Sequence, residues 1–79
     1  MNLAIVILNY NGRHHLESYI ENIIANSEGH DVIIADNAST DDSIAYIKTF
    51  NAIQLIEISS NLGYAGGYNE ALKRIKANV

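Results

Sequence analysis

The stretch that decides the fold is DVIIADNASTDD, residues 31–42: an apolar run, an aspartate at its end, and a polar loop. Residues 32–35 predict a buried strand, and residues 36–41 predict the loop that follows it. In a parallel α/β sheet, such a loop leaves the carboxyl end of its strand, at the edge where these sheets bind ligands. Asp36 is therefore either a hydrogen-bond acceptor for a ligand or only part of a capped turn.

The rest of the chain alternates between patterns of strands and helices. We expect further strands at residues 3–8, with both faces buried, and 53–58, and helices at residues 13–26, after Ser39, and after a glycine-rich loop at residues 59–67. Ser39 and Asp42 predict a variant capping box at the start of the second helix. Tyr68, Leu72, Ile75 and Val79 give the last helix its apolar side.

The order βαβαβα predicts an α/β fold with three layers and a parallel sheet in the order 3-2-1. The first two helices should cover one face of the sheet, and the third should cross to the other. One flank of the strand at residues 3–8 is then unpaired, and we expect another copy of the chain to associate there.

Composition restricts the class of protein. The chain has 79 residues, which limits it to one domain, and 48% of them are hydrophobic, which suits a globular core. It has no cysteine, which excludes disulfides and thiolate metal sites. The net charge of −4, with no basic stripe, argues against nucleic-acid binding. The apolar start, residues 1–8, is too short for a transmembrane segment.

Three loops should meet at one edge of the sheet: residues 9–12, 36–41 and 59–67. There Tyr10 can stack on a base, Asp36 can accept hydrogen bonds from a base or sugar, and amides near Gly66 and Gly67 favour an anion. Each feature also has a purely structural interpretation, as a loop aromatic, a turn residue or turn glycines. The glycine spacing does not match a dinucleotide fingerprint or a phosphate loop.

Three blocks at fitting separations resemble the N-terminal blocks of family 2 glycosyltransferases, which have the GT-A fold. They are VILNYNG at residues 6–12, IADNASTD at 34–41 and NLGYAGGYN at 61–69, and the rhamnosyltransferase-like branch is the most similar. The resemblance implies transfer of a sugar from a UDP- or dTDP-linked donor to an acceptor, in polysaccharide or cell-surface glycan synthesis. It also implies donor contacts by Leu8, Tyr10, Asp36, Asn37, Gly66, Gly67 and Asn69.

The sequence departs from this family in its catalytic groups. It contains no D-x-D motif, which in the family holds Mg²⁺ or Mn²⁺, and no recognisable catalytic base. We therefore expect residues 1–79 to be the incomplete nucleotide-sugar-binding part of a glycosyltransferase domain, without metal and inactive alone. The full-length enzyme should be cytoplasmic, or peripheral at the inner face of the membrane. The alternatives are a non-catalytic nucleotide-binding or interaction module with the same half-fold, and a receiver-like domain.

Overall fold

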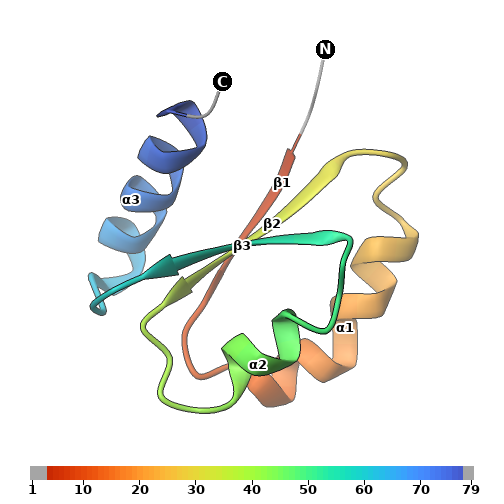
Figure 1. Ribbon diagram of the computed structural model, residues 1–79, viewed down its shortest axis with the longest axis horizontal. Helices are drawn as coiled ribbons and strands as arrows, with labels where there is room; N and C mark the ends of the chain where they lie inside the picture. Colours follow the sequence, from red (N-terminus) through yellow and green to blue (C-terminus); the bar gives the residue numbers. More distant parts are fainter. Residues whose placement is uncertain (1–3, 78–79) are drawn as a thin grey trace.

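A computed structural model describes residues 4–77 as three strands alternating with three helices (Figure 1). The elements are β1 (Ala4–Asn9), α1 (Arg13–Ala25), β2 (Asp31–Asn37), α2 (Ser43–Ile47), β3 (Ile53–Ile58) and α3 (Gly63–Ala77). Both strand pairs are parallel, and the sheet order is β1-β2-β3. The predicted α/β class and strand order are confirmed. The predicted strand start at Leu3 and the helix residue Val79 lie outside the described residues.

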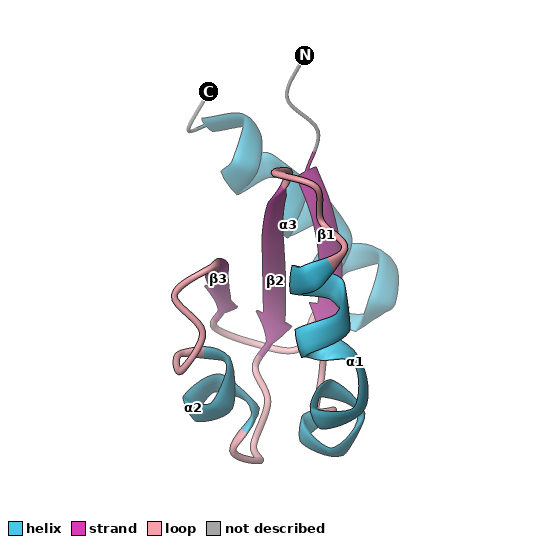
Figure 2. Ribbon diagram, turned by 90° about the vertical axis from the view of Figure 1, so that its right-hand side faces the viewer, coloured by secondary structure: helices cyan, strands magenta, loops and turns pink. Residues whose placement is uncertain are grey.

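The sheet is the middle of three layers, with α1 and α2 on one face and α3 on the other (Figures 1 and 2). Two core clusters correspond to the two faces. One contains Leu16, Ile20, Val32, Ile34, Ile47 and Ile53, and the other contains Ala35, Ile58 and Ala71. Because side chains alternate along a strand, Ile34 and Ala35 of the central strand β2 enter different clusters. This two-sided burial explains the continuous apolar run at residues 32–35.

Several element boundaries differ from the sequence prediction. β2 continues through Asn37, so Asp36 and Asn37 belong to the strand end rather than to a loop. The predicted capping box is wrong: α2 begins only at Ser43, and the Ser39 hydroxyl donates to Asp36 at 2.7 Å. The buried Asp36 carboxylate competes successfully for this hydroxyl because it also accepts the backbone N–H of Ser39, at 2.8 Å.

The glycine-rich segment is also shorter as a loop than predicted. α3 begins at Gly63, so Gly66 and Gly67 lie inside the helix. The first strand differs as well, because residues 5–8 of β1 are only partly buried. Among residues 4–77, β1 pairs with β2 alone and forms an edge of the sheet, which accounts for its exposure. No helix in this part of the chain is long and apolar enough to cross a bilayer.

Candidate functional site

The candidate site lies where the three parallel strands end. The pairing register places Asn9 of β1 beside Asp36 of β2, and Asn37 of β2 beside Ile58 of β3. The loops that follow the strands therefore leave the sheet from the same edge, where α/β proteins bind ligands. The convergence of these loops is as the sequence predicted.

Asp36 joins the end of β1 to the loop after β2. Its side chain is 0% exposed. Its Oδ1 accepts from Asn9 Nδ2 at 2.9 Å and from Ser39 Oγ at 2.7 Å, and its Oδ2 accepts from the Ser39 amide at 2.8 Å. Because a carboxylate has about four acceptor positions, these bonds leave little capacity for a ligand. The carboxylate is therefore fixed in place by its protein partners.

Asn37 joins β2 to the start of α3. Its Oδ1 accepts from the Leu62 amide at 3.0 Å, and its Nδ2 donates to Asn61 Oδ1 at 3.1 Å and to the Gly63 carbonyl at 3.0 Å. Gly63 has φ +74°, a conformation that side chains rarely adopt, so glycine is needed at this helix start. Asn37 thus fixes the turn that sets the position of α3.

A cleft of about 360 Å³ opens between these strand ends and α3. Its lining combines three residues predicted to contact the donor, Leu8, Tyr10 and Asn37, with Asn61, Gly63 and Tyr64. The last three lie in the loop that was expected at this edge and in the NLGYAGGYN block, but the donor contacts were assigned to Gly66, Gly67 and Asn69 instead. Small-molecule sites commonly have volumes of about 300–1,000 Å³. The cleft is therefore large enough for part of a nucleotide.

Two tyrosines are exposed at this cleft. Tyr10 is 48% exposed and Tyr64 is 76% exposed. The Tyr64 ring lies edge-to-face against Tyr68, with ring centroids 5.2 Å apart. A side-chain hydrogen bond with Tyr68 raises the pKa of Tyr64 above its ordinary value of 10.0, so this phenol is neutral at pH 7. The cleft therefore presents neutral aromatic surface to a ligand.

The remaining predicted residues do not gather in this cleft. Gly67 is buried, and a Cβ atom there would lie 2.9 Å from Leu8 Cδ1 and 3.0 Å from Asn37 Nδ2. It thus allows α3 to approach two residues of the cleft wall. Gly66 and Asn69 line a separate hollow along α3, of about 550 Å³. The free amides of the helix start were predicted near Gly66 and Gly67. Because α3 begins at Gly63, they lie at the residues before Gly66 instead.

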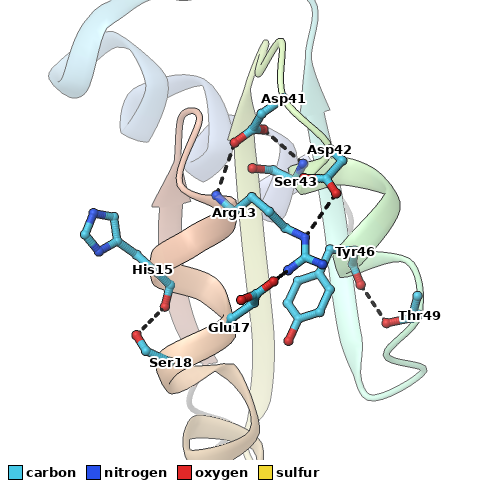
Figure 3. A network of polar contacts seen from close by, with 9 residues as sticks. All are labelled: Arg13, His15, Glu17, Ser18, Asp41, Asp42, Ser43, Tyr46 and Thr49. Atoms are coloured by element: carbon cyan, nitrogen blue, oxygen red, sulfur yellow. Dashed lines mark hydrogen bonds and ion pairs between the residues drawn. The ribbon is translucent and has the colours of Figure 1, made fainter.

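A charged cluster braces the two helices beneath the site (Figure 3). The Arg13 guanidinium lies 3.7 Å from the Tyr46 ring centroid and forms ion pairs with Glu17 and Asp42. The Arg13 amide donates to Asp41 Oδ2 at 3.2 Å. Ser43, whose amide donates to Asp41 Oδ1 at 2.9 Å, and then the Arg13 amide lower the pKa of Asp41. These contacts hold the start of α1 against α2 without entering the cleft.

The described residues do not fit a metal ion. Within residues 4–77, no group of three or more histidine, cysteine, aspartate or glutamate side chains is placed to hold one. His14 and His15 are exposed on α1.

The parallel sheet, with helices on both faces and a cleft at the carboxyl ends of its strands, places the chain among the three-layer α/β domains, which bind ligands at this edge. The family model for glycosyl transferase family 2 matches residues 4–79, and the chain belongs to this family. The family resemblance seen in the three sequence blocks is thereby confirmed, and the family implies a nucleotide-sugar donor. A search of curated proteins finds no match to the chain.

Proposed function

We propose that this chain binds the nucleoside part of a nucleotide diphosphate sugar in the cleft lined by Leu8, Tyr10 and Asn37. The observation that carries the proposal is the meeting of these residues, from two of the three family blocks, in one cleft at the strand ends. The cleft also has the chemistry that a nucleoside needs, since an exposed ring and an apolar side chain adjoin polar backbone and amide groups.

In the proposed complex, the base stacks on the Tyr10 ring with Leu8 beneath it. Asp36 is 0% exposed and does not line the cleft, so its role in the proposal is to hold Asn9 and Ser39 in place beside the base. A uracil or thymine base can stack on Tyr10 in the same way, so the proposal covers UDP- and dTDP-linked donors equally. Gly67 shapes the cleft, and Gly66 and Asn69 serve a part of the donor that extends along α3. Binding and orienting the donor is thus the contribution of this chain to sugar transfer, within a rhamnosyltransferase-like enzyme of polysaccharide or cell-surface glycan synthesis.

Titration with UDP and dTDP, followed by amide chemical shifts, tests the proposal. We expect shifts at residues 8–12, 36–39 and 61–69. Tyr10→Ala should weaken binding about five-fold to 150-fold, because stacking of a base on an aromatic ring contributes about 1–3 kcal/mol. His15→Ala is the matched control, since this exposed side chain lies on α1. Shifts confined to other regions, or equal affinities of the two variants, would contradict the proposal.

A further inference from the structure

Asn11 connects the loop that carries Tyr10 to the loop after β2. Its side-chain Oδ1 accepts hydrogen bonds from the backbone amides of Thr40, at 2.7 Å, and Asp41, at 3.2 Å. Its backbone amide donates to Ser39 Oγ at 2.8 Å. We infer that Asn11 is a positioning residue: it holds Tyr10 at the mouth of the cleft without touching the ligand. The inference rests on the proposed function, because it concerns how Tyr10 is kept ready for a base.

The backbone at this position explains why asparagine is suited to it. Asn11 has φ +50°, in the left-handed region that glycine, asparagine and aspartate tolerate best. Its side-chain carbonyl can accept two hydrogen bonds at once, as the amides of Thr40 and Asp41 require. One residue thus supplies both an unusual backbone turn and a double acceptor.

The link between the two loops is reciprocal. The side chain of Asn11 accepts a hydrogen bond from the backbone amide of Asp41. The side chain of Asp41 in turn accepts one from the backbone amide of Arg13, at 3.2 Å (Figure 3). On the other side of Tyr10, Asn9 donates to Asp36 at 2.9 Å. Both neighbours of Tyr10 are therefore bonded to the end of β2 or to the segment that follows it.

Tyr10 depends on these neighbours because its own ring is only half covered. With 48% of the residue exposed, packing alone gives the ring little restraint. A binding group that must be ordered by its ligand lowers affinity, whereas a group held in place beforehand does not. Loss of the Asn11 contacts should therefore weaken nucleotide binding even though Asn11 is outside the cleft lining.

Three substitutions separate the backbone from the side chain. Asn11→Asp keeps the acceptor and tolerates the positive φ, Asn11→Gly keeps only the backbone freedom, and Asn11→Ala keeps neither. We expect Asn11→Gly and Asn11→Ala to weaken UDP binding about ten-fold, as the loss of net hydrogen-bond stabilisation suggests. Asn11→Asp should bind within about two-fold of the wild type at about 0.15 M salt, where screening limits repulsion of the diphosphate.

The measurements use the 79-residue chain and two readouts. UDP affinity is measured by amide-shift titration, and the NMR signals and NOEs of the Tyr10 ring report its position without ligand. Urea unfolding verifies that each variant is folded. We expect the NOEs between the Tyr10 ring and its surroundings to be lost in Asn11→Gly and retained in Asn11→Asp.

Two outcomes would overturn the inference: unchanged Tyr10 ring contacts and affinity in Asn11→Gly, or an Asn11→Asp variant as impaired as Asn11→Gly. Failure of the wild type to bind UDP would instead refute the proposed function. In that event the Tyr10 ring signals of the same variants still decide whether Asn11 positions the ring.

Discussion

Substitution of Gly67 by alanine tests how closely α3 must approach the cleft. The added Cβ would lie 2.9 Å from Leu8 Cδ1, 3.0 Å from Asn37 Nδ2 and 3.2 Å from Asn37 Cγ. Asn37 cannot move away easily, because its side chain makes hydrogen bonds to Asn61, Leu62 and Gly63. We therefore expect α3 to shift outward in Gly67→Ala.

The variant Gly66→Ala is the control for the size of the stability loss in Gly67→Ala. Alanine is favoured over glycine inside a helix by about 1 kcal/mol, and this gain applies to Gly66→Ala and Gly67→Ala alike. A Cβ at Gly66 would lie 3.0 Å from one atom, Leu62 Cβ, whereas a Cβ at Gly67 would lie within 3.2 Å of three atoms from two side chains. An extra methyl group in a tightly packed site costs about 1–3 kcal/mol. The Gly67→Ala variant should therefore be less stable than Gly66→Ala by about 1–3 kcal/mol.

Urea unfolding of both variants measures this difference, with thermal unfolding as a second readout. For a domain of this size, each 1 kcal/mol lowers Tm by about 4–8 °C. Equal slopes of free energy against urea would show that the denatured state is unchanged. If Gly67→Ala is as stable as Gly66→Ala or more so, the close approach of α3 to Leu8 and Asn37 is not needed, and the reasoning fails.

Two further predictions concern the charged cluster between α1 and α2. In a double-mutant cycle, Arg13→Met and Tyr46→Leu should show a coupling of about 0.5–1 kcal/mol, because the guanidinium lies 3.7 Å from the ring centroid; a coupling near zero by urea unfolding would contradict it. The pKa of Asp41 is lowered from its ordinary 3.8 in the folded state, so its contribution to stability is present above that value and disappears as pH falls through the lower folded pKa. Asp41→Asn should therefore lose less stability than the wild type when urea unfolding is repeated from about pH 6 down to about pH 2, and parallel losses would refute the role of Asp41.

The sequence predicted the fold well where burial decides it. The third strand was predicted at residues 53–58, and β3 has these bounds. The helix predicted at residues 13–26 ends one residue earlier, at Ala25. Leu16, Ile20 and Ile23 recur at helical spacing in α1, and β3 is a short, mostly apolar run, so local pattern and tertiary burial agree.

The differences arise where a distant side chain determines the local structure. Nothing within residues 59–67 indicates that Asn37 will bond to Leu62 and Gly63 and so start α3 early. Ser39 is a different case, because its partner is only three residues away: Ser39 has the features of a helix cap, but Asp36 accepts hydrogen bonds from its hydroxyl and amide. Local propensity cannot rank such competing partners. The misplaced helix start also explains why Tyr64, although part of the loop predicted at residues 59–67, was not named as a donor contact.

The polar residues of the three blocks mainly support one another. Asp36 and Asn37 are 0% and 2% exposed, and their side chains bond to the first and third blocks respectively, whereas Tyr10 and Tyr64 are 48% and 76% exposed. A side chain whose hydrogen-bonding capacity is used by the protein has little left for a ligand, while an exposed aromatic ring loses unfavourable contact with water when a base covers it. We therefore infer a division of roles, in which the buried amides and carboxylate determine the shape of the cleft and the aromatic rings contribute most of the nucleotide affinity.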